Sequence, residues 1–216
     1  MPAVPMTPLT ELERDALAEL SNIAMARAAS NLRKMVDHEV LLSVPTVEIL
    51  TQATAAERVA NPDRPNVVAV RQDFTGPFSG RALLIFPEAG SLELVRTVVG
   101  KDLPLEDIVD FEDEALAETG NIILNSWIAT IANLLKQALK MSLPVVLRGD
   151  GRRMFESPEP LERLVLFLHI KFEISQREIS GYIALLMDIQ SVEQLRALIA
   201  DYVGSVTAVK GTDPHH

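Results

Sequence analysis

The sequence contains two similar halves, and this internal repeat limits the possible folds more than any other feature. Six residue pairs keep an offset of 99: Leu17 and Leu116, Ala28 and Trp127, Leu32 and Ile131, Met35 and Leu134, Ser43 and Ser142, and Pro45 and Pro144. Two later motifs have offsets of 101 and 100: Ser79-Gly80-Arg81 with Ser180-Gly181-Tyr182, and Ser91-Leu92-Glu93 with Ser191-Val192-Glu193. Chance matches would drift far more over this length. We therefore infer an internal duplication and predict a single domain with pseudo-twofold symmetry.

Each half is predicted to begin with a long helix and to continue with strands. A helical pattern opens at Leu9, where Thr10 and Glu13 have the spacing of a capping box. Residue periodicity predicts further helices over Pro87–Val99, Phe111–Lys140 and Ser191–Val203, with Gly100 and Gly204 as stops. Predicted strands are Val40–Leu50 (one strand broken at Pro45, or a strand pair), Asn66–Phe74, Gly80–Phe86, Val145–Leu147, Leu164–Ile174 and Ile179–Met187. Ala53–Pro65 and Gly149–Pro160 are predicted as a connection and a loop, and Glu106–Glu114 as a solvated connection and helix start.

The predicted fold class is mixed α/β (α+β), with two long helices packed side by side on a largely antiparallel sheet. Hydrophobic residues make up 48% of the 216 residues, which is enough for a sizeable core. Residues 9–204 should form one domain from repeats 9–100 and 111–204, because neither half alone hides its apolar faces. Residues 1–8 and 205–216 are predicted to be flexible tails.

Composition excludes several classes of function. The net charge of −10 and the absence of a basic cluster disfavour nucleic-acid binding. The chain has no cysteine, so disulfides, thiol nucleophiles and thiolate zinc sites are excluded. No apolar run is long enough for a membrane span and no secretory leader is recognisable, so we expect a cytoplasmic protein without membrane insertion.

A polar pattern is preserved in both long helices. Its members are Asp15, Glu19 and Asn22 in the first copy, and Glu114, Glu118 and Asn121 in the second. The spacing i, i+4, i+7 places each set on one helix face. Each Asn precedes a proline, Pro45 or Pro144, by 23 positions. A single such pattern is most often an ordinary solvated face. Two copies with the same proline spacing favour a surface function.

This pattern resembles the signature of the CheC/CheX/FliY family of chemotaxis phosphatases. The layout is most similar to that of CheC, with two signatures in one short chain and no C-terminal flagellar domain. The likeness extends from about Leu9 to Gly204 and includes residues 43–49 and 118–122. The first copy departs from the family pattern, because Ser21, Ala24 and Ala26 stand where the family favours glycine.

The resemblance implies hydrolysis of the aspartyl phosphate of a CheY-type response-regulator receiver. Asn22 and Asn121 would orient the attacking water, and Glu19 and Glu118 would pair with a receiver lysine. The chain itself would bind no cofactor or metal, since Mg²⁺ belongs to the receiver. A carboxamide suits this task because it offers one acceptor and two donors in a fixed plane, and because positioning supplies most of the catalysis in phosphoryl transfer.

Two alternatives stay open from the sequence. The chain could be a non-catalytic module that binds a receiver, or an adaptor for a CheD-type deamidase, which is also a candidate partner of the enzyme. Other polar residues offer less. His38 and His169 lack neighbouring ligands and are predicted to be packed rather than metal-bound. Trp127 is predicted to lie in the core, and Asn125 has no counterpart in the first copy, where Ala26 stands.

Overall fold

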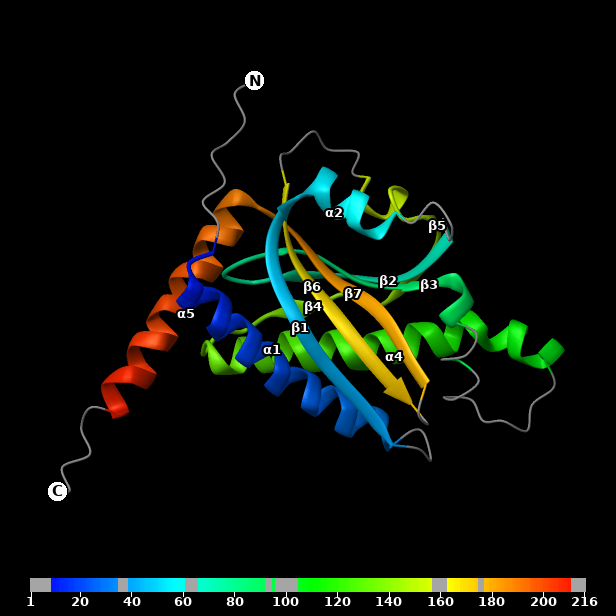
Figure 1. The fold of residues 1–216 in the computed structure, drawn as a ribbon, viewed down its shortest axis with the longest axis horizontal. Coiled ribbons are helices and arrows are strands. Elements are labelled where there is room, and N and C mark those ends of the chain that lie inside the picture. The colour runs from blue at the N-terminus through cyan, green and yellow to red at the C-terminus, as the bar shows by residue number, and fades with distance from the viewer. Residues whose placement is uncertain are drawn as a thin grey trace.

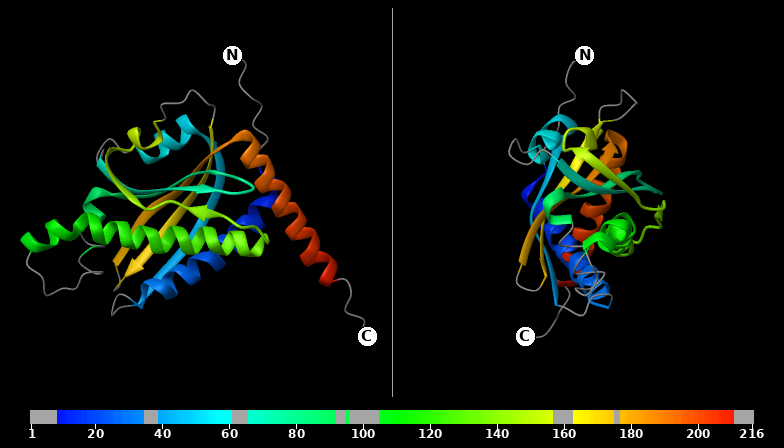
Figure 2. Two further views of the ribbon diagram at one scale, coloured as in Figure 1. Left: turned by 180° about the vertical axis from the view of Figure 1, so that it is seen from behind. Right: turned by 90° about the vertical axis from the view of Figure 1, so that its right-hand side faces the viewer.

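The computed structural model describes residues 9–34, 39–60, 66–91, 95, 105–156, 163–174 and 177–210. Within these ranges the chain forms a seven-stranded sheet with helices on both faces, as Figures 1 and 2 show. The strands are β1 (Val40–Thr51), β2 (Asn66–Thr75), β3 (Gly80–Pro87), β4 (Lys140–Met141), β5 (Val145–Asp150), β6 (Arg163–Ile174) and β7 (Arg177–Asp188). The predicted mixed α/β class with a largely antiparallel sheet is confirmed.

The order of the strands shows how the two repeats combine. The sheet runs β1-β6-β7-β3-β2-β4, and β5 also pairs with β2. The first strand of each repeat therefore lies beside the second strand of the other repeat: β1 pairs with β6, and β5 pairs with β2. The third strands, β3 and β7, pair at the centre. If the two repeats are exchanged, the same order of strands is obtained, read from the opposite edge of the sheet. The predicted pseudo-twofold symmetry requires this arrangement.

Two long helices, α1 (Glu11–Leu32) and α4 (Leu105–Leu134), lie side by side against one face of the sheet. Thr10 and Glu13 form the predicted capping box. Helix α4 begins before the predicted Phe111, so the acidic run belongs to the helix, where carboxylates complement its dipole. It also ends before the predicted Lys140. Lys136 adopts a left-handed φ of 55°, and the N–H of Gln137 returns to the carbonyl of Ala132, which closes the helix.

The opposite face of the sheet carries α2 (Gln52–Val59) and the 3-10 turn η1 (Arg153–Phe155). The prediction of an irregular connection over Ala53–Pro65 is wrong for its first half. The side chain of Thr51 caps α2, and Ala55 and Val59 are buried against the sheet. The predicted loop after Gly149 likewise contains the end of β5 and η1. Residues 61–65 and 157–160 lie outside the described ranges.

The C-terminal helix α5 (Ile189–Lys210) continues through Gly204, contrary to the predicted stop. A glycine inside an exposed helix costs only about 1 kcal/mol, so it does not by itself end one. Of the predicted helix over Pro87–Val99, Pro87 is the last residue of β3, residues 88–91 and 95 are helical, and the others lie outside the described residues.

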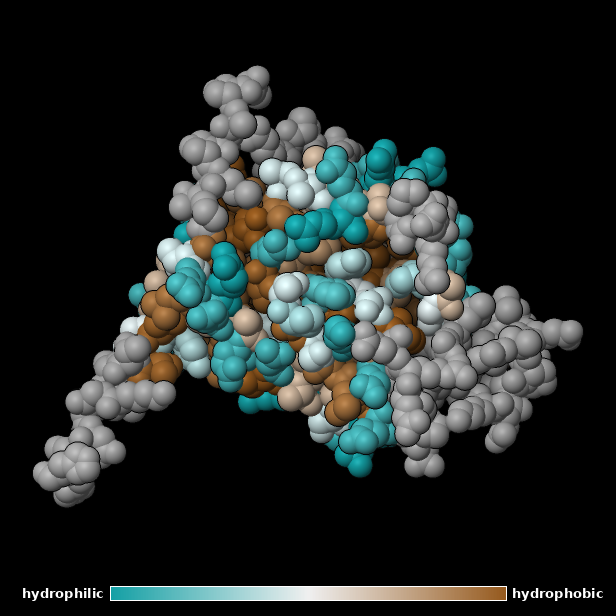
Figure 3. Space-filling view, viewed as in Figure 1, coloured by the Kyte–Doolittle hydropathy of each residue, from teal (hydrophilic) through white to brown (hydrophobic). Residues whose placement is uncertain are grey.

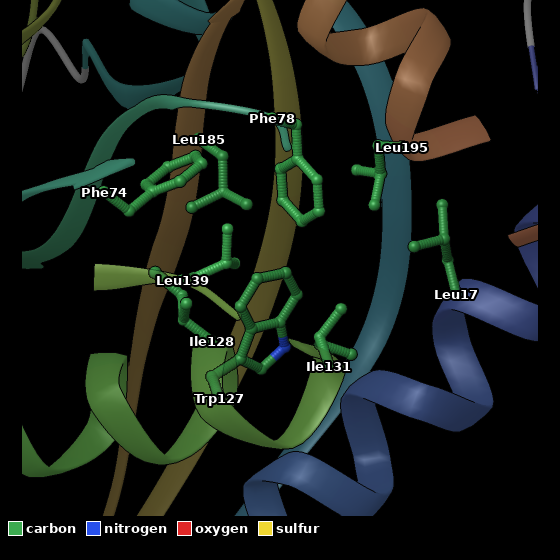
Figure 4. A pocket seen from close by; sticks show the side chains of 9 residues that line it. All are labelled: Leu17, Phe74, Phe78, Trp127, Ile128, Ile131, Leu139, Leu185 and Leu195. Carbon is green, nitrogen blue, oxygen red and sulfur yellow. The ribbon is translucent and has the colours of Figure 1, made fainter. Parts of the chain in front are cut away.

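The larger core lies between α1, α4, α5 and the sheet. Trp127 is 2% exposed, which confirms its predicted place in the core. Figure 4 shows its indole beside Phe78 and Ile131, with Leu17 and Leu195 contributed by α1 and α5. The cavity left between these side chains is only about 10 Å³, so the helices are closely packed. This packing fixes the outward faces of α1 and α4.

Candidate functional site

The polar residues of α1 lie on its solvent-facing side. Asp15, Glu19 and Asn22 are exposed, whereas Leu17 and Leu20 on the other side are buried. The carboxamide oxygen Oδ1 of Asn22 accepts a hydrogen bond of 3.0 Å from the backbone N–H of Val44. The side chain is thus exposed but held at its oxygen end.

Pro45 explains why Val44 is available for this bond. The pairing of β1 with β6 shifts register between Ser43 and Thr46, which confirms one strand broken at Pro45 rather than a strand pair. A proline has no N–H to donate to a ladder. Val44 falls in the gap of the register, and its N–H is directed to Asn22 instead. The constant spacing between Asn and Pro therefore has a structural cause in the first copy.

The second copy holds its asparagine differently. Oδ1 of the half-buried Asn121 accepts hydrogen bonds from Gln72 Nε2 at 3.1 Å and from Asn125 Nδ2 at 2.6 Å. Gln72 Nε2 also donates to the carbonyl of Ser142 at 2.9 Å. Glu114 and Glu118 are exposed on the same helix. Side chains thus replace the backbone donor of the first copy.

Gln72 was not identified from the sequence. It is 1% exposed on β2, and its Oε1 atom has no hydrogen-bond partner among the described residues. The sequence does contain a pattern that could have identified it. Every second residue of β2 faces the helices, and these residues are Val68, Val70, Gln72 and Phe74. One polar residue in an otherwise apolar period-2 series is expected to have a specific partner.

Packing beneath the two asparagines also differs. Gly120 lets α4 approach β2, because a Cβ at this position would lie 2.5 Å from the side chain of Val70. Ser21 occupies the matching position of α1 and is fully buried, with no partner for its hydroxyl in the described part of the chain. The preceding residue therefore sets how closely each Asn approaches the sheet.

Ion pairs anchor the acidic first turns of the repeats. Two nitrogens of Arg196 on α5 contact the carboxylate of Glu13 at 2.8 and 2.9 Å, and this hydrogen bonding lowers the pKa of Glu13. At offset 99, Glu112 accepts a hydrogen bond from Ser91 and pairs with Arg148 at 3.1 Å. Glu112 is buried, so the prediction of a wholly solvated acidic run is wrong there.

Glu19 and Glu118 differ from these anchors. Neither carboxylate forms an ion pair or hydrogen bond with another described residue. Each is exposed one turn before its Asn. Their charges therefore face solvent, where a partner can approach.

A groove of about 770 Å³ lies next to the first polar face. Asp15 and Ala18 line it on one side, and residues 45–49 of β1 line it beside His169 and Tyr182. Figure 3 shows polar and apolar side chains mixed over β1 and α1 on this side of the molecule. The exposed face of α1 thus continues into a concave surface.

The structure gives His169 a packed position, as predicted. Its ring lies 5.4 Å from that of Tyr182. Across the described ranges, no group of three or more His, Asp or Glu is arranged to hold a metal ion. His38 lies outside those ranges. None of the helices described here is long and apolar enough to cross a membrane.

Sequence relatives agree with this architecture. A model of the family described as "Chemotaxis phosphatase CheX" matches residues 68–169. The CheY-P phosphatase CheC of Bacillus subtilis is 26% identical over 196 residues, which cover 87% of this chain and 93% of that protein. By sequence and fold, the chain is similar to proteins of the CheC/CheX/FliY family.

Two FliY proteins extend the likeness. The flagellar motor switch phosphatase FliY of Bacillus subtilis is 24% identical over 64% of this chain and 36% of that protein. The crystal structure of FliY from Thermotoga maritima superposes with a TM-score of 0.71 at 19% identity, covering 90% of this chain and 98% of that chain. This CheC/CheX/FliY fold therefore presents α1 and α4 as its two polar helix faces.

Proposed function

We propose that this chain is a phosphatase that hydrolyses the aspartyl phosphate of a CheY-type receiver domain. The observation that carries the proposal is the fixed carboxamide on each repeat. Asn22 and Asn121 are both held at Oδ1 by donors on the sheet side. The family is one of chemotaxis phosphatases, and the Bacillus subtilis relative is named for activity on CheY-P.

In this reaction, the main task of the chain would be to position the attacking water. An acyl phosphate is already activated, so water can attack the phosphorus without a nucleophile from the phosphatase. The amide group of Asn22 or Asn121 would enter the receiver's site and hold that water in line, which removes much of the entropic barrier. The magnesium ion would be held by the receiver.

Glu19 and Glu118 would orient the receiver on each face. Each carboxylate is exposed one turn before its Asn and lacks an ion-pair partner within the described residues. A lysine beside the receiver's phosphorylated aspartate would supply the opposite charge. The groove next to Asp15 offers further contact area for a partner on the α1 side.

The decisive experiment follows the decay of a phosphorylated CheY-type receiver in Mg²⁺ with catalytic amounts of the whole protein. We expect faster decay that is lost when Asn22→Ala and Asn121→Ala are combined. Unchanged decay with measurable binding of the receiver would overturn the phosphatase and favour the adaptor. Faster decay that survives the double substitution would overturn the assignment of these residues.

A further inference from the structure

The two asparagines differ in the hydrogen-bonding capacity that they have left. A carboxamide oxygen has two acceptor positions. Oδ1 of Asn22 accepts one hydrogen bond within the described residues, from Val44. Oδ1 of Asn121 accepts two, from Gln72 and Asn125. One acceptor position remains at the first site, and none remains at the second.

The orientation of Asn121 is fixed by a chain of bonds. The carbonyl of Ser142 accepts from Gln72 Nε2, so the amide nitrogen of Gln72, rather than its oxygen, faces this end of α4. The same nitrogen donates to Asn121 Oδ1 at 3.1 Å. Turning Asn121 over would bring its amide nitrogen against two donors. Its Nδ2 group therefore points away from the sheet.

The attacking water needs an acceptor. Its oxygen must present a lone pair to phosphorus, so the water is oriented through its hydrogens, and the group that holds it must accept one. Nδ2 is only a donor, and a hydrogen bond to the water's second lone pair would lower its nucleophilicity, so an acceptor suits this task better. Asn22 meets this requirement with its remaining position on Oδ1, whereas Asn121 meets it only after losing one of its two donors.

We infer that the two sites are unequal, and that Asn125 is a positioning residue that restrains the second one. This inference rests on the proposed function. The site at Asn22 carries most of the turnover. Asn125 occupies the acceptor position on Asn121 that the water requires, at the short distance of 2.6 Å. Ala26, at the matching position of α1, leaves the first site open.

Reciprocal substitutions test this. In an Asn22→Ala background only the second site can act, and adding Asn125→Ala should raise its kcat by about tenfold, the value of roughly one hydrogen bond, with little change in KM. In an Asn121→Ala background only the first site can act. There Ala26→Asn places a donor one turn after Asn22 and should lower kcat by a similar factor.

The outcomes separate this inference from the proposed function. A lower or unchanged kcat after Asn125→Ala would overturn the inference, because Asn125 would then support Asn121 or have no effect on it. An unchanged first site after Ala26→Asn would overturn it as well. Ala26 is exposed, so that variant does not depend on repacking a core. Full activity in the Asn22→Ala/Asn121→Ala protein would instead reject the assignment of the two asparagines, and unchanged decay with the unsubstituted protein would reject the proposed function itself.

Discussion

The backbone N–H of Val44 donates a 3.0 Å hydrogen bond to the carboxamide oxygen of Asn22, which lies 22 residues earlier in the chain. This bond connects the polar face of α1 to the irregular pairing of β1 at Pro45. The asparagine and the proline, 23 positions apart in the sequence, therefore form one structural unit. The proline interrupts the ladder, the interrupted ladder releases an N–H, and the N–H holds the asparagine.

Replacing Pro45 should therefore impair the first site without contacting it. With Pro45→Ala, residue 45 gains an N–H and β1 can pair more regularly with β6, which draws Val44 away from Asn22. We expect the turnover of an Asn121→Ala protein to fall about fivefold, as for the loss of one hydrogen bond. The matched variant is Pro144→Ala in an Asn22→Ala protein, where the effect should be smaller because Asn121 is held by side chains. Equal losses would show that the prolines act in another way.

Single substitutions of the two asparagines should divide the activity. Asn22→Ala and Asn121→Ala should each leave part of the rate, with the smaller remainder in Asn22→Ala. The combined change should lower the accelerated decay of the phosphorylated receiver by on the order of 10²–10³, as expected when a group that stabilises the transition state is lost. Decay is measured with all proteins at equal concentration, and equal circular dichroism spectra serve as the control for folding.

Removing the two exposed glutamates should weaken recognition more than chemistry. In a Glu19→Gln/Glu118→Gln protein we expect KM for the receiver to rise several-fold and to depend less on salt, since an exposed ion pair is worth about 1 kcal/mol or less and is screened. Glu57→Gln, on α2 at the opposite face of the sheet, makes the same charge change as either single substitution, Glu19→Gln or Glu118→Gln, and should leave KM unaltered. An equal rise in KM for that variant would point to net charge instead of a specific contact.

The contact between Glu13 and Arg196 should make stability depend on pH. The hydrogen bond from Arg196 lowers the folded-state pKa of Glu13 below its ordinary value of 4.5. The stabilisation is therefore complete above that value and is lost as the pH falls through the lower, folded-state pKa. Glu13→Gln should reduce the free energy of unfolding at pH 7 by about 2 kcal/mol, and the difference from wild type should shrink in acid.

Urea unfolding at several pH values provides the measurement. The exposed neighbour Glu11 offers the control, since Glu11→Gln removes the same charge from the same helix turn without breaking a contact to α5. A difference from wild type that stays constant down to pH 3 would contradict the assignment to this carboxylate.

Alanine should have opposite effects on stability at the two matching positions beneath the sites, Gly120 and Ser21. Gly120→Ala would force Val70 and α4 apart, which we expect to cost about 1–3 kcal/mol and to slow the second site. Ser21→Ala removes a buried hydroxyl that has no partner among the described residues, so stability should change little or rise slightly. Thermal unfolding of the two variants in parallel distinguishes these cases, and a stable Gly120→Ala protein with normal turnover would refute the argument.

The repeat predicted much of the architecture because duplicated apolar positions are retained for packing. It indicated two long helices, the antiparallel strands and the polar faces around Asn22 and Asn121. The short helix α2 was not predicted because only two of its residues, Ala55 and Val59, are buried. Two apolar positions are too few to reveal a helical periodicity. The end of α4 was not predicted because it depends on the left-handed backbone conformation of Lys136, which a lysine rarely adopts.

The environment of Asn121 could not be predicted for a different reason. Gln72 comes from the other repeat, 49 residues away in the sequence, and reaches α4 only because β5 lies beside β2 in the sheet. Periodicity describes one element at a time. It gives no information about which strand of the other repeat will lie under a given helix turn. The position of β2 under α4 is what gives Asn121 a side-chain donor, Gln72, where Asn22 has a backbone donor.

The exchange of first strands between the repeats has a consequence for synthesis on the ribosome. β1 can complete its pairing only with β6, which ends at Ile174, so at about 5–20 residues per second the strand waits for roughly ten seconds. During that interval its backbone groups are open to any other extended chain. The chain must therefore emerge as far as β6 before β1 can complete its pairing, so the first repeat depends on the second for its final structure.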